Sequence, residues 1–79
     1  MLSTKMKFDW KVELNKLLTP GEAFTFQLES GNFVYGVFRE WGTSGKLEEY
    51  VTVSLEQGIK VIHYMDIKRV WRGKKSFPA

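Results

Sequence analysis

An alternation of apolar and polar residues starts near Glu22 and limits the fold more than any other feature of the chain. In the first such segment Phe24, Phe26 and Leu28 alternate with polar residues. Because successive side chains of a β-strand point to opposite faces of a sheet, this period of two predicts a strand with one buried face. Further segments of this kind, separated by polar or glycine-containing turns, predict strands over residues 33–41, 50–55, 59–64 and 68–72.

The second predicted strand contains a glycine, Gly36, near its middle. A glycine inside a strand often marks a bulge or a sharp bend. Five short strands in a flat sheet leave two edges and one apolar face in water, whereas a curled sheet removes most of that exposure. We therefore expect a mainly β fold, a small five-stranded antiparallel barrel in which Gly36 lets the second strand serve both halves.

A helical pattern precedes the strands. Four apolar residues recur at helical spacing on one face: Trp10, Leu14, Leu17 and Leu18. Asp9 can cap a helix that starts at Trp10, because its carboxylate accepts hydrogen bonds from the amides of the first turn. Pro20 ends the helix, since proline disfavours the helical conformation of the residue before it. We expect one short N-terminal α-helix that closes an end of the barrel.

Length and composition fit a single domain. The chain has 79 residues, 43% of them hydrophobic and 15% aromatic, which is enough for one core. We divide it into a flexible N-terminus over residues 1–8, a helix-plus-barrel domain over residues 9–72 and a basic flexible tail over residues 73–79. The N-terminus does not resemble a secretory signal, and no apolar run is long enough to span a bilayer. We therefore expect a cytoplasmic protein without a membrane partner.

Residue types that carry catalysis or hold metals are scarce. The chain has no cysteine and a single histidine, His63, which excludes a disulfide scaffold and a zinc site with cysteine ligands. Its acids and serines fall into no recognisable catalytic pattern, and a barrel of this size rarely provides the cleft that a pair of acids needs. We expect no enzyme, no cofactor, no bound metal and no small-molecule substrate.

Positive charge is concentrated near the C-terminal end. The net charge is +3, and five of the twelve bases lie within residues 68–75, which leaves seven bases against nine acids elsewhere. The five are Lys68, Arg69, Arg72, Lys74 and Lys75. A cluster without acids suits a polyanion or an acidic partner, and the alternative is a solvated tail that keeps the protein soluble.

The second strand also carries aromatic residues that point outward. If Val34, Gly36 and Phe38 face the core, alternation turns the residues between them to the other side. The residues turned outward are Phe33, Tyr35, Val37, Arg39 and Trp41. Tyr50 on the third strand points to the same side. Aromatic rings flanked by cations hold unpaired bases in many proteins, so Tyr35 and Trp41 join the five basic residues as the predicted nucleic-acid site. The alternative is that this strand is buried on both faces, partly beneath the helix.

Two stretches resemble small barrels of the Sm-like and SH3-like superfamily. The pattern Leu28-x-x-Gly31-x-x-Val34-x-Gly36-x-Phe38 is similar to the first Sm signature, a strand–turn–strand with a glycine at the bend. Residues 62–70 look like the closing stretch of Sm-like barrels such as the C-terminal domain of RimP-type ribosome maturation factors. Together the two stretches cover about residues 22–72 and imply an SH3-like or Sm-like barrel.

The sequence departs from the RNA-binding Sm proteins where those proteins read bases. Their first signature continues to an aspartate and an asparagine, whereas this chain has Trp41-Gly42-Thr43-Ser44. Arg72-Gly73 can be aligned with the Arg-Gly pair of the second signature, but only residues 74–79 then remain for the final strand. We place Asp66-Ile67 at the last turn instead, and the base-reading residues of the family are not carried over.

Two functions compete on these observations. The first is a non-enzymatic module that binds nucleic acid, single-stranded RNA above all. If four of the C-terminal cations contact the strand, the log–log dependence of affinity on salt should have a slope of about −3. The second is a protein-interaction or homo-oligomeric assembly module, whose interface would be Phe33, Tyr35, Val37 and Tyr50.

Overall fold

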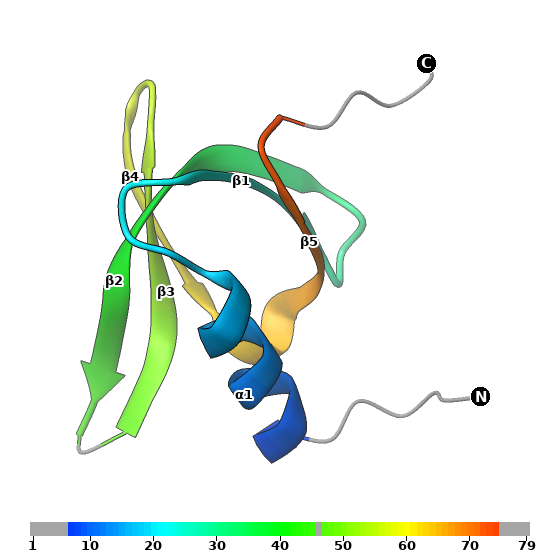
Figure 1. The fold of residues 1–79 in the computed structure, drawn as a ribbon, viewed down its shortest axis with the longest axis vertical. Coiled ribbons are helices and arrows are strands. Elements are labelled where there is room, and N and C mark those ends of the chain that lie inside the picture. Colours follow the sequence, from blue (N-terminus) through cyan, green and yellow to red (C-terminus); the bar gives the residue numbers. More distant parts are fainter. Residues whose placement is uncertain (1–6, 46, 75–79) are drawn as a thin grey trace.

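A helix and five antiparallel strands make up the fold (Figure 1). The computed structural model describes residues 7–45 and 47–74. The elements are α1 (Lys7–Leu17), β1 (Ala23–Leu28), β2 (Phe33–Ser44), β3 (Leu47–Leu55), β4 (Gly58–His63), the 3-10 helix η1 (Tyr64–Asp66) and β5 (Ile67–Arg72). The strands form one sheet in the order β4-β3-β2-β1-β5. The expected mainly β class, with five antiparallel strands and one short N-terminal helix, is confirmed.

The second strand passes very close to the third at Gly36. A Cβ atom added there would lie 2.5 Å from Cγ1 of Val53 and 2.6 Å from the carbonyl oxygen of Ser54. Only glycine allows so close an approach, so Gly36 lets the sheet curl over its own core (Figure 1). The strand order ends at β4 and β5, which η1 connects. A ladder between these two strands, which would close the barrel, stays a prediction.

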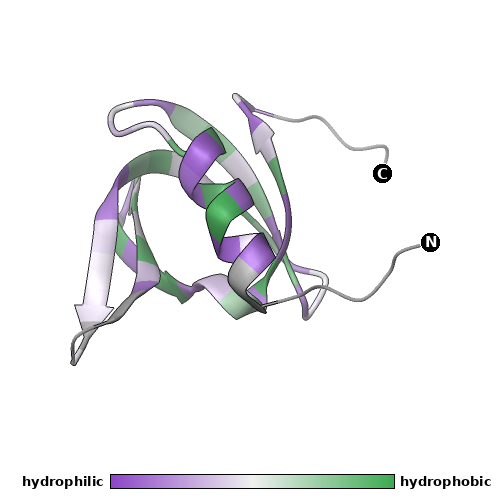
Figure 2. Cartoon of the chain, turned by 60° about the horizontal axis from the view of Figure 1, so that its bottom comes forward, coloured by the Kyte–Doolittle hydropathy of each residue, from purple (hydrophilic) through white to green (hydrophobic). Residues whose placement is uncertain are grey.

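The core lies inside the curl, and every element contributes to it. Its buried residues are Leu14, Leu18, Phe24, Phe26, Phe38, Val51, Val53, Ile62, Tyr64 and Ile67. Four of the residues predicted to face inward, Phe24, Phe26, Val51 and Val53, are all 0% exposed, although Thr25 between the two phenylalanines is also buried. Figure 2 shows α1 lying across the open side of the curled sheet. There Leu14 and Leu18 reach the core, so the helix covers apolar surface that the strands leave open.

A tryptophan ties the helix to the link between β4 and β5. The indole Nε1–H of Trp10 donates to the carbonyl oxygens of Tyr64 at 3.1 Å and Ile67 at 2.9 Å, one at each end of η1. The helix begins at Lys7 instead of Trp10, and Asp9 lies in its first turn. A carboxylate in the first turn is stabilised by the helix dipole, so Asp9 still favours this end of the helix without being its cap.

A bulge in the second strand overturns one predicted side-chain direction. The pairing of β2 with β3 shifts between Phe38 and Glu40, so Arg39 is an extra residue in β2. An extra residue reverses the alternation beyond it, so Trp41 falls on the same face as Phe38. The Trp41 ring packs edge-on against Phe38 and Tyr64, with 6.5 Å between ring centroids in each pair. The outward direction predicted for Trp41 is wrong.

The second and third strands also run further than expected. Gly42 pairs with Tyr50 and Ser44 with Leu47, so the pairing of β2 with β3 continues past residue 41 and starts before residue 50, the limits expected from the sequence. At the other end of the sheet, the amide of Gly73 donates to the carbonyl of Ala23 at 2.8 Å, which continues the pairing of β5 with β1. The remaining parts of the two segments predicted to be flexible, residues 1–6 and 75–79, lie outside the described residues.

Candidate nucleic-acid interface

Three strands present two rows of side chains on the outer face of the sheet. Residues directly opposite each other in antiparallel strands share a face, so the pairing of β2, β1 and β5 defines each row. The first row is Phe33, Gln27 and Arg69, and the second is Tyr35, Thr25 and Trp71. We call the set Phe33, Tyr35, Trp71, Arg69 and Lys74 the aromatic face.

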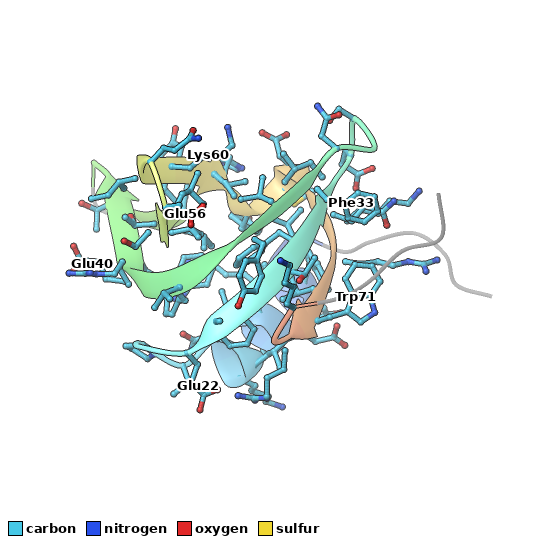
Figure 3. All side chains as sticks on the ribbon, turned by 90° about the horizontal axis from the view of Figure 1, so that it is seen from above. Glu22, Phe33, Glu40, Glu56, Lys60 and Trp71 are labelled. Carbon is cyan, nitrogen blue, oxygen red and sulfur yellow. The ribbon has the colours of Figure 1, made fainter. Side chains whose placement is uncertain are left out.

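Two rings of this face are open to solvent, and the third, Trp71, is half-buried. Phe33 and Tyr35 are each 45% exposed, and the Phe33 and Trp71 rings pack against each other with centroids 6.3 Å apart. Figure 3 shows Phe33 and Trp71 on the same side of the molecule, with Glu40 on the opposite side. The helix reaches the core from the inner side of the sheet, so the alternative in which it covers Phe33 and Tyr35 is wrong.

Thr25, a buried residue between two of these rings, fixes the position of Gly73. Thr25 lies between Tyr35 and Trp71 in its row, yet it is only 3% exposed. Its hydroxyl donates to the carbonyl oxygen of Gly73 at 2.8 Å, which fixes the chain just after β5. Lys74 follows, and its Nζ lies 5.7 Å from the centroid of the Tyr35 ring. The C-terminal positive charge is thereby brought onto an exposed ring, a favourable cation–π arrangement.

The predicted cluster of cations is divided between two faces. Arg69 belongs to a row of the aromatic face, and Lys68 beside it is exposed. Arg72 points to the other side, where its guanidinium pairs with Glu22 and lies 5.5 Å from the Phe24 ring centroid. Lys75 lies outside the described residues. Two of the five predicted cations, Arg69 and Lys74, therefore belong to the aromatic face, while Lys68 is the extra residue where the pairing of β5 with β1 shifts.

The predicted protein interface is also divided. Phe33 and Tyr35 stand together, and Val37 is half-buried further along β2. Tyr50 lies on β3 opposite Gly42, far along β2 from Phe33 and Tyr35, and is edge-on to His63 with ring centroids 5.2 Å apart. His63 in turn accepts a hydrogen bond at Nδ1 from the amide of Met65, 3.1 Å away, so it caps η1.

One member of the aromatic face was not predicted to lie there. Trp71 belongs to neither of the two sets of residues predicted from the sequence. The alternation of side chains along β5 explains the position of Trp71. Val70 contacts the core, so its neighbours in the strand point outward. The same rule places Arg72 on the inner side with Val70, so the division of the cations was also readable from the sequence.

Within residues 7–45 and 47–74, no three His, Asp or Glu side chains gather closely enough to hold a metal ion. In the same part of the chain, no helix combines the length and apolar character needed to cross a membrane.

The fold and this face define a class of protein, a small curled five-stranded β domain with a helix across its open side and an exposed aromatic, cationic face. Comparison with family models, curated proteins and solved structures gives no match. The resemblance to Sm-like barrels therefore stays a prediction.

Proposed function

We propose that this protein is a non-enzymatic module that binds single-stranded RNA on its aromatic face. The observation that supports the proposal most is the exposure of Phe33 and Tyr35, 45% each, beside Trp71 and within reach of Lys74. Stacking of a base on an aromatic ring contributes about 1–3 kcal/mol and tolerates any sequence, because every base has a flat face. Arg69 and Lys74 flank the rings and can neutralise the phosphates of the same strand.

Salt dependence tests the electrostatic part of the proposal. Each cation that neutralises a phosphate of a single strand contributes about −0.7 to the log–log slope of affinity against salt. Arg69 and Lys74 together predict a slope of about −1.4, shallower than the slope of about −3 expected if four of the C-terminal cations contact the strand. The measurement is fluorescence anisotropy of a labelled uridine decamer at several salt concentrations. A slope near zero, or no binding at low salt, would remove this function.

Stacking is tested by replacing Tyr35. Tyr35→Ala should weaken binding of the decamer by about 5- to 150-fold, because one stacking platform is lost. Tyr35→Phe keeps the ring and should bind nearly as the unmodified protein does. Tyr50→Ala is the matched control, since Tyr50 packs against His63 away from the face. Equal affinity of Tyr35→Ala and the unmodified protein, with both shown to be folded by circular dichroism, contradicts stacking on this residue.

A different surface favours a protein partner as the second candidate function. β4 is an edge of the sheet, and its Ile59 and Val61 are 67% and 57% exposed. An exposed apolar edge strand is a template for pairing with another strand. If a second copy binds there, light scattering should give twice the 9.2 kDa chain mass, and the double variant Ile59→Lys, Val61→Lys should return it to one chain. A single-chain mass at high concentration excludes self-association.

A further inference from the structure

A hollow adjoins the aromatic face at the turn between β3 and β4. It has a volume of about 430 Å³, and the residues that line it are Tyr35, Gly36, Val37, Ser54, Leu55, Glu56 and Lys74. We call it the Glu56 hollow. Tyr35 and Lys74 belong to both the hollow and the aromatic face, so a strand bound on the face can place one base in the hollow. Its volume falls in the lower part of the range for small-ligand sites, about 300–1,000 Å³.

The lining provides what a nucleobase needs. The Tyr35 ring offers a stacking surface, and Val37 offers apolar contact, whereas the Leu55 side chain packs toward the core. Lys74, whose Nζ lies 5.7 Å from the Tyr35 ring centroid, can pair with the adjoining phosphate. Glu56 is exposed in the turn after β3 and brings the one carboxylate among the lining residues. Figure 3 labels this residue on its hairpin.

The carboxylate restricts the choice of base. An ionised carboxylate only accepts hydrogen bonds. The negative charge of a phosphate backbone repels it, so hydrogen bonds donated by the base have to offset this repulsion. Proteins read unpaired bases through their Watson–Crick edges. On that edge guanine presents two donors side by side, N1–H and the N2 amino group, which match the two oxygens of a carboxylate. Uracil presents one N–H between two carbonyl oxygens, which a carboxylate repels.

We infer that the Glu56 hollow binds a guanine base of the bound single strand, stacked on Tyr35, with the carboxylate of Glu56 accepting hydrogen bonds from N1–H and the N2 amino group. The inference rests on the proposed function, because the strand is held on the aromatic face. It adds a sequence preference to a surface that otherwise binds any base.

The experiment compares two labelled RNA decamers, one of uridine alone and one with a single central guanosine. The guanosine decamer should bind about tenfold more tightly, as expected for a good bidentate contact. A third decamer with inosine at the same position lacks the N2 amino group and should lose most of this gain. Glu56→Gln should abolish the preference and leave binding of the uridine decamer equal or tighter, because one acceptor and one negative charge are removed.

Glu40→Gln is the matched control, since it removes the same charge on the opposite side of the molecule from Phe33 and Trp71 (Figure 3). This variant should keep the preference for guanosine. If both decamers bind equally, or if Glu56→Gln retains the preference, the inference is overturned while the proposed function stands. If neither decamer binds the unmodified protein at low salt, the proposed function fails and the inference fails with it.

Discussion

Gly36→Ala is expected to lose about 3 kcal/mol of unfolding free energy, which is at the upper end of what one added methyl group costs in a packed site. The new Cβ would meet Cγ1 of Val53 at 2.5 Å, the carbonyl oxygen of Ser54 at 2.6 Å and Cδ2 of Leu55 at 2.8 Å. A carbonyl oxygen cannot move without its strand, so β2 and β3 must separate at the bend. Urea and thermal unfolding followed by circular dichroism measure the loss, which corresponds to a fall in Tm of more than about 10 °C.

Gly42→Ala is the matched control in the same strand. A Cβ at Gly42 would have its nearest neighbour, Cβ of Tyr50, at 3.6 Å, which is ordinary contact. Gly42 is also absent from the glycines of positive φ, so alanine fits its backbone. Its stability should change by less than about 1 kcal/mol, in either direction. If Gly36→Ala is as stable as Gly42→Ala, β2 does not approach β3 as closely as described.

Sequence reasoning predicted the strands well because their signal is local. Apolar residues alternate with polar ones in β1 and β3, and most positions expected to be inward there are fully buried, as at Phe26 and Val53, while Leu28 and Leu55 at the strand ends are half-buried. The role of Gly36 was also predictable, because a glycine has few other reasons to stand inside a strand of aromatic residues. The bulge at Arg39 was not predictable, since an extra residue is defined only by the register of the neighbouring strand.

The structure brings only some of the residues of the predicted site together. Clustering in sequence placed Arg72 beside Lys74, but alternation along β5 turns Arg72 toward Glu22 on the other side. Lys74 reaches Tyr35 because Gly73 has a φ of +78° and the carbonyl of Gly73 accepts from buried Thr25. That redirection of the chain depends on a tertiary contact, so no local pattern could reveal it. The Glu56 hollow has the same origin, since its walls come from β2, the end of β3 and the segment after β5.

Replacing Trp10 should have the second large effect, because this residue joins α1 to both ends of η1. Trp10→Ala removes a half-buried ring packed against the core and the donor to the carbonyls of Tyr64 and Ile67, and we expect a loss of about 3 kcal/mol. Lys16→Ala, at an exposed position of the same helix, is the control and should change stability by less than about 0.5 kcal/mol. Chemical unfolding of the three proteins measures the difference.

Trp10→Phe separates the hydrogen bonds from the packing of the ring. It keeps an aromatic side chain but cannot donate to the two carbonyl oxygens, and losing such a donor at a part-buried site costs about 1–3 kcal/mol. The phenylalanine variant should therefore fall between the unmodified protein and Trp10→Ala. Because η1 leads directly into β5, loosening it should also disturb the strand that carries Arg69 and Trp71, and RNA affinity should fall together with stability. A Trp10→Phe protein as stable as the unmodified one would show that the indole N–H does not hold the helix to η1.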